Sequence, residues 1–289
     1  MEESFLNKRN LILILMNKQL IIQLIIIFVL TQGIGLYAGN FMIEQDIHTT
    51  LVTDNPDDVE NSIGLMVWIL GFTAILLILI KFAPEWLLTI LLKGIESMAI
   101  FGTTLIVLLP TGIVDEIILL IAIVFVVLRI IFKEHLLLRN ASSIVAAAGA
   151  GALIGASLGV IPILVFIVLL GVYDYIAVFK TKHMVTLAKG VTKKNLAFTY
   201  ALPTKEHKFE LGTGDMVIPL AFAISVLATQ TTSGLVKFIP SVAILIASLA
   251  GLIITLDYAS KNKGKPLPAL PLQTVLMVLV FGITKILGF

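Results

Sequence analysis

Long apolar segments constrain the fold of this chain more than any other feature of its sequence. A helix needs about 20 apolar residues to cross the hydrocarbon layer of a membrane, and roughly 17 to 25 are tolerated. Hydrophobic residues make up 58% of the 289-residue chain and charged residues 13%, a composition typical of membrane proteins. We therefore predict an all-α fold, a polytopic membrane protein with nine transmembrane helices at residues 20–37, 63–80, 86–109, 113–132, 143–158, 160–179, 211–232, 235–256 and 267–287.

The connections between these spans are alternately rich and poor in basic residues. Lys8, Arg9 and Lys18 precede the first span, whereas residues 39–62 carry six acidic residues and no Lys or Arg. Residues 180–210, the longest polar connection, contain seven lysines. Because cytoplasmic loops of membrane proteins retain Lys and Arg, we predict a multi-pass protein of the cell membrane. Its amino terminus and the loop 180–210 are then cytoplasmic, and an odd number of spans places the carboxyl terminus outside.

The predicted spans fall into two groups. Residues 1–159 form an amino-terminal bundle of five helices, and residues 160–289 form a second portion of four helices. Gly151, Gly155 and Gly159 recur at four-residue spacing in the fifth span, a pattern that allows a neighbouring helix to approach closely. The chain contains no cysteine, which excludes disulfide bonds, thiolate metal sites and thiol catalysis.

Two aspartates, Asp174 and Asp215, lie well inside apolar runs. An ionisable group at this depth costs at least roughly 2.5 kcal/mol by insertion scales, so it usually has a function. Asp174 lies shortly before the inner end of the sixth span and Asp215 shortly after the start of the seventh, so the two share a depth about 6 to 8 Å below the inner boundary. Two other charged residues, Lys93 and Glu96, are three positions apart in the third span, and we expect them to form an intrahelical ion pair.

A shared depth allows the two aspartates to face each other. Two carboxylates a few ångströms apart in a medium of low dielectric constant cannot both ionise, so they share one proton. An aspartic protease needs this arrangement, because one carboxylate takes a proton from water while the other protonates the carbonyl oxygen of the scissile bond.

The residues around this pair favour an exposed backbone. Gly212 and Gly214 come shortly before the second aspartate, and glycine permits conformations and close approaches that other residues do not. Pro266, Pro268 and Pro271 lie at the start of the ninth span and prevent a regular helix there. Irregular backbone at membrane depth is tolerated only inside protein or beside a wet cavity, and an unwound substrate could add a strand to such an edge.

Three motifs on three separate spans now stand in order: Tyr173-Asp174, Gly212-Thr213-Gly214-Asp215 and Pro268-Ala269-Leu270. This set resembles the intramembrane aspartyl (GxGD) proteases of the presenilin and signal peptide peptidase families. The cytoplasmic amino terminus and the proline that follows the third motif are similar to presenilins, and the short loops favour a prokaryotic, archaeal-type homologue. The motifs cover mainly residues 160–289, whereas the first five spans match the family only in number.

The resemblance implies an endopeptidase that cleaves membrane proteins within their transmembrane segments, in the lipid bilayer and without metal or cofactor. It implies no nucleic-acid partner and permits a homo-oligomer. Asp174 and Asp215 would be catalytic. The residues expected to bind substrate are Tyr173, Gly212, Thr213, Gly214, Pro268, Ala269 and Leu270. Thr213 stands where eukaryotic presenilins usually have a bulkier apolar residue, which leaves the substrate preference open.

A cation- or proton-coupled membrane transporter is the alternative function. Transporters also bind ions with paired intramembrane carboxylates and proline-broken helices, although the sequence contains no recognisable internal repeat. Other classes of membrane protease lack their motifs here. The four histidines do not form an H-E-x-x-H metal site, and no Gly-x-Ser-x-Gly motif is present for a serine hydrolase.

Overall fold

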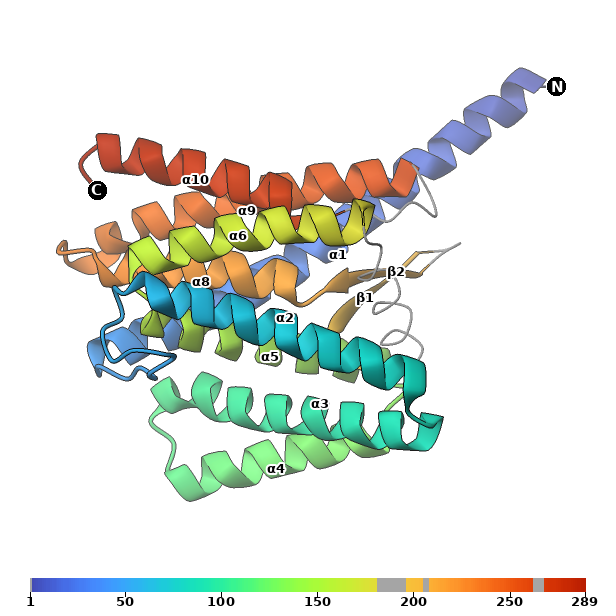
Figure 1. The fold of residues 1–289 in the computed structure, drawn as a ribbon. Coiled ribbons are helices and arrows are strands. Elements are labelled where there is room, and N and C mark those ends of the chain that lie inside the picture. Colours follow the sequence, from blue (N-terminus) through green and yellow to red (C-terminus); the bar gives the residue numbers. More distant parts are fainter. Residues whose placement is uncertain (1, 181–195, 205–207, 262–267) are drawn as a thin grey trace.

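The computed structural model describes residues 2–180, 196–204, 208–261 and 268–289 of the chain (Figure 1). Its elements follow the order α1 (Glu2–Glu44), α2 (Val59–Phe82), α3 (Glu85–Leu108), η1 (Leu109–Thr111), α4 (Asp115–Ile131), α5 (Leu136–Ser157), α6 (Val160–Phe179), β1 (Thr199–Pro203), β2 (Lys208–Gly212), α8 (Gly214–Ala228), η2 (Gly234–Phe238), α9 (Ile239–Lys261) and α10 (Leu270–Ile286).

The described part of the chain contains nine α-helices, as the apolar segments predicted. Six of these helices are long and apolar enough to cross a membrane, whereas α8 and α10 are apolar but shorter. The bundle also exposes many large apolar side chains, such as Trp68 with 73% of its surface exposed. An apolar outer surface is what a lipid-facing bundle requires, and the protein is therefore a multi-pass membrane protein.

The observed helix boundaries show where local chemistry modifies the hydrophobic pattern. The sixth helix spans 160–179 as predicted. The seventh predicted span, 211–232, begins as helix only at Gly214, because residues 208–212 form a strand. The ninth begins at Leu270 with Pro271 in its first turn, a position that tolerates proline because its missing N–H would have no intrahelical partner there.

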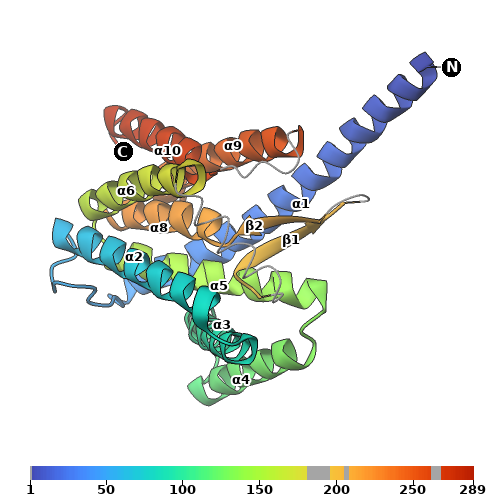
Figure 2. The ribbon, with the colours of Figure 1, turned by 45° about the vertical axis from the view of Figure 1, so that its right-hand side comes forward.

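An all-α prediction describes the bundle but misses a β-hairpin. Strands β1 and β2 pair antiparallel, with Thr199 opposite Gly212 and Ala201 opposite Glu210. The hairpin lies within and just beyond the predicted loop 180–210, of which residues 181–195 and 205–207 are outside the described part of the chain. Figures 1 and 2 place the hairpin at the end of the bundle from which the amino-terminal part of α1 projects.

Helix α5 lies at the centre of the bundle, where it packs against α1, α3 and α8. The predicted close approach along its glycines is confirmed at two positions. A Cβ atom on Gly155 would come within 2.6 Å of the backbone oxygen of Ala221, and one on Gly151 would come within 2.6 Å of the Leu220 side chain. Small residues on α5 therefore let α8, the helix that carries Asp215, pack directly against it.

Candidate active site

Asp174 lies on α6 near its carboxyl end and is only 8% exposed. Its carboxylate accepts a hydrogen bond from the backbone of Leu270, the first residue of α10. The first N–H groups of a helix have no partner within the helix and carry its partial positive charge. The start of α10 therefore provides a donor that holds the Asp174 carboxylate in place.

Asp215 lies in the first turn of α8 and is half-buried. The negative charge of Asp174 acts on it, so the two carboxylates are within electrostatic reach of each other. Asp174 and Asp215 thus meet where α6, α8 and the start of α10 come together. This arrangement of three helices holds the two aspartates near each other.

Gln273 connects the elements around this pair, and the sequence motifs gave no sign of it. It is fully buried on α10, where its Nε2 atom donates to the backbone oxygen of Asp215 at 3.2 Å and to Oγ of Ser248 on α9 at 3.1 Å. Gly251 of α9 makes room for this contact, because a Cβ there would lie 3.2 Å from the Gln273 backbone nitrogen. The sequence feature that could have identified Gln273 is the presence of a glutamine in an otherwise apolar helix.

The residues before Asp215 connect strand β2 to α8. The backbone N–H and the Oγ1 of Thr213 both donate to the backbone oxygen of Phe198, each at 3.1 Å. Neither Gly212 nor Gly214 has the positive φ that would demand glycine, so unusual backbone conformation is not the reason for either residue. A Cβ on Gly212 would instead stand 3.7 Å from Oδ2 of Asp215, and one on Gly214 would meet nothing within 4 Å. The glycines therefore leave open space beside the carboxylate, as expected if another chain approaches it.

The remaining predicted site residues differ in their burial and in their contacts. Ala269 and Leu270 are buried and Pro268 is half-buried, so the third motif reaches the dyad through the backbone of Leu270. Tyr173 shares a side-chain hydrogen bond with Thr73 of α2. The Tyr173 hydroxyl is therefore hydrogen-bonded to helix α2. Tyr173 also lies within electrostatic reach of Asp174.

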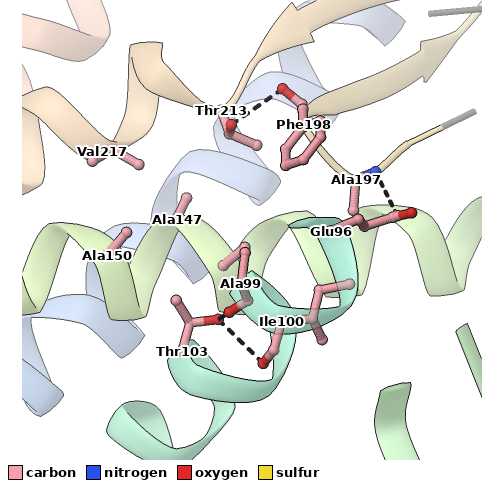
Figure 3. Close-up of a pocket in the computed structure, with 11 residues that line it drawn as sticks. Glu96, Ala99, Ile100, Thr103, Ala147, Ala150, Ala197, Phe198, Thr213 and Val217 are labelled. Carbon is pink, nitrogen blue, oxygen red and sulfur yellow. Dashed lines mark hydrogen bonds between the residues drawn. The ribbon is translucent and has the colours of Figure 1, made fainter. Parts of the chain in front are cut away.

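A cavity of about 160 Å³ lies behind the start of α8, between α3, α5 and the segment that enters β1 (Figure 3). Thr213 and Val217 line it from one side and alanines of α3 and α5 from the other. Thr213 is the residue that caps α8 and Val217 lies four positions further on, so the two are on the same side of the helix, whereas Asp215, two positions from each, lies on the opposite side. The cavity is thus separate from the carboxylate pair.

Glu96 lines this cavity and fixes the entry to strand β1. Its Oε1 atom accepts the backbone N–H of Ala197 at 2.8 Å (Figure 3) and lies 3.0 Å from an Nη2 atom of Arg129 on α4. The prediction of an intrahelical ion pair between Lys93 and Glu96 is therefore wrong. Position along one helix suggested Lys93, but burial favours the arginine of a neighbouring helix, whose fork of donors can satisfy a buried carboxylate.

The amino-acid sequence matches the family model described as signal-peptide peptidase, presenilin aspartyl protease over residues 25–211. The match includes Asp174 and ends before Gly212. It also extends through the first five helices, so the similarity to the family covers more of the chain than the three motifs. A bundle of membrane helices with two apposed carboxylates is the expected architecture of such enzymes, and the chain belongs to this family.

Solved structures have the same fold. A presenilin-family intramembrane aspartate protease in a C222 crystal form superposes with a TM-score of 0.70 at 23% sequence identity, covering 93% of this chain and 99% of the other. The same description in a P2 form gives a TM-score of 0.67 at 24% identity, covering 92% and 97%. No curated protein matches the chain by sequence. The family and the membrane-spanning helices together make the protein an intramembrane aspartyl protease.

Proposed function

We propose that Asp174 and Asp215 are the catalytic dyad and that the enzyme hydrolyses peptide bonds within transmembrane segments of other membrane proteins. The observation that carries this assignment is the approach of the two carboxylates at the junction of α6, α8 and α10. One carboxylate takes a proton from a water molecule, which attacks the scissile carbonyl carbon. The other donates its proton to the carbonyl oxygen, so no covalent intermediate with the enzyme is needed.

Two contacts to α10 would hold the dyad in a fixed geometry. The Leu270 backbone bonds to the carboxylate of Asp174, and Gln273 bonds to the backbone of Asp215. Pro268 and Ala269, which precede the helix, determine where α10 starts and hence where its first N–H group points. In this proposal the third motif positions both aspartates and forms one wall of the substrate site.

An extended substrate would bind beside Gly212. The sheet has two strands in the described part of the chain. Gly212 ends β2, shortly before Asp215. Addition of a substrate strand on the β2 side would satisfy the backbone that a peptide exposes when its helix unwinds. The space beside Gly212 and Gly214 would then place the scissile bond next to Asp215. Thr213, whose hydroxyl bonds to Phe198, would shape this site from behind.

The orientation in the membrane is also part of the proposal. Lysines before the first span and in residues 180–210 indicate a cytoplasmic location, and Figure 1 shows the amino terminus and the hairpin at the same end of the bundle with the carboxyl terminus at the other. The dyad would therefore lie nearer the cytoplasmic side. Coupled transport stays the weaker alternative, because the family model that matches the chain is that of a protease.

The dyad is tested with Asp174→Asn and Asp215→Asn, changes that preserve shape while removing the carboxylate. Each purified variant is incubated with a single-span peptide in detergent or lipid, and the products are mapped by mass. We expect each variant to lose at least about 100-fold in cleavage rate, since a positioned acid or base contributes roughly that much or more.

A matched control is Asp115→Asn, which changes an exposed aspartate at the start of α4 and should retain the parent rate. Far-ultraviolet circular dichroism and thermal unfolding establish that each variant is folded. Substantial cleavage by either folded dyad variant would refute the assignment.

A further inference from the structure

The outer edge of strand β1 is closed by a side chain of helix α5. The Nδ2 atom of Asn140 donates to the backbone oxygen of Ala201 at 2.9 Å, and the Ala201 N–H donates to Oδ1 of Asn140 at 2.8 Å. A neighbouring strand would make this same pair of hydrogen bonds with Ala201. Oγ of Ser143, one turn along α5, lies within hydrogen-bond distance of the backbone oxygens of Ala197 at 3.1 Å and Thr199 at 3.2 Å, and its single proton can be donated to either. Helix α5 thus occupies the place that a third strand would take beside β1.

The same helix also holds strand β2. Arg139 is fully buried, and its guanidinium pairs with both carboxylate oxygens of Glu210. It also donates to the hydroxyl of Thr199 and, from Nε, to the backbone oxygen of Leu196 at 3.2 Å. A bidentate arginine–carboxylate pair has a strict geometry. Arg139 therefore fixes both strands relative to α5 along the strand direction as well as across it.

These contacts determine where the β2 backbone lies next to Asp215. The backbone groups of Ala201 point to Asn140 and away from β2, so Ala201 and Glu210 form a pair without hydrogen bonds between them. Residues two positions apart on a strand repeat this orientation. Gly212 therefore presents its N–H and C=O on the outer side of β2, where a substrate strand would pair.

We propose that Asn140, Ser143 and Arg139 are positioning residues that set the register of the substrate strand relative to the dyad, and thereby select which peptide bond is cleaved. This inference rests on the proposed function, because it requires a substrate paired with β2. A strand that slips by one residue turns all of its side chains to the opposite face, whereas a slip by two residues preserves the faces. Loosening the hairpin should therefore shift cleavage by two residues.

The test is Asn140→Ala, with Ser143→Ala as a milder second variant, each incubated with the single-span peptide whose cleavage position in the parent enzyme is known. We expect both variants to yield an additional product whose cleavage site is displaced by two residues, with a larger share in Asn140→Ala than in Ser143→Ala. Mass spectrometry of both product halves measures the position, and it is independent of the total rate. Ser143→Ala keeps the test valid if Asn140→Ala does not fold.

Asn40→Ala is the matched control, because this residue bonds to Glu44 near the carboxyl end of α1, whereas the hairpin lies at the end from which the amino-terminal part of α1 projects (Figure 1). It should give the parent product alone. If folded Asn140→Ala and Ser143→Ala cleave only at the parent position, at any rate, the inference is wrong. Failure of the proposed function has a different result, since the parent enzyme would then not cleave or Asp215→Asn would still do so.

Discussion

The side chain of Tyr200 is buried between the β-hairpin and the helix bundle. It is fully buried, and its hydroxyl donates to the backbone oxygen of Ser143 at 3.1 Å. Burial raises the pKa of the Tyr200 phenol above its ordinary value, because the ionised form would lose its hydration. The folded protein therefore retains this proton at a pH where the unfolded chain has released it.

The sign of the resulting pH dependence follows from this difference. Above about pH 10 the unfolded chain binds fewer protons than the folded chain, so stability decreases as pH rises. We predict that Tyr200→Phe costs about 1 kcal/mol near neutral pH through the lost hydrogen bond, and that its stability decreases less between neutral pH and pH above about 10. Thermal unfolding at the two pH values measures this. An equal decrease in the parent and in Tyr200→Phe would contradict the prediction.

The sequence alone singled out Asp174 and Asp215 as the candidate dyad, but it singled out few of the residues that contact them. Depth and motif order are properties of position along the chain, and they suffice to predict that Asp174 and Asp215 form a pair. Asn140 and Ala201 are 61 residues apart, and Gln273 and Asp215 are 58 apart. Which side chain faces which across such separations depends on the rotation of each helix about its axis, and one sequence does not specify that rotation.

At the scale of elements, the helices followed from apolar length, whereas the hairpin did not. Its signal was present, since Phe209 and Leu211 alternate with Lys208 and Glu210, which is the period of a half-buried strand. The sequence signal of two five-residue strands beside a lysine-rich connection is nevertheless much weaker than the signal of apolar spans of about 20 residues. The predicted start of the seventh span at residue 211 is wrong for this reason.

The contact between α5 and α8 gives the clearest prediction at this scale. Gly155→Ala would place a methyl group against the backbone of Ala221, which cannot move as a flexible side chain can. We expect destabilisation of about 1 to 3 kcal/mol from overpacking and a reduced cleavage rate, because α8 carries Asp215. Thermal unfolding and the peptide assay measure the two effects.

Gly102→Ala in α3 is the corresponding control, since its Cβ would meet nothing within 4 Å. Alanine is favoured over glycine in a helix by up to about 1 kcal/mol, so this variant should be at least as stable as the parent. Equal stability of the Gly155 and Gly102 variants would show that α5 and α8 have room to separate.

At the scale of the whole molecule, the fold extends over nearly the full chain of the solved presenilin-family structures. The amino and carboxyl termini lie at opposite ends of the bundle (Figure 1). This placement is the one that an odd number of membrane crossings requires. Composition and apolar length therefore anticipated the architecture well, because the bilayer permits few arrangements of a chain with so many apolar segments.

We predict that a tag at the amino terminus is accessible only from the cytoplasm and a tag at the carboxyl terminus only from outside. The physical reason is the retention of lysine-rich segments on the cytoplasmic side. Membrane-impermeant labelling of intact and permeabilised cells distinguishes the two sides. Labelling of both termini from one side would mean an even number of crossings.

Sheets polymerise only when each unit offers two edges, since every strand that joins must leave an edge for the next unit. In this protein the amide of Asn140 occupies one edge from within the bundle. Among the residues that the structure describes, the hairpin is then monofunctional in the polymer chemist's sense, because its β2 edge can pair with one added strand but the hairpin cannot link two units into a growing chain. A protease that binds extended apolar segments can thus hold them one at a time, without seeding a fibre.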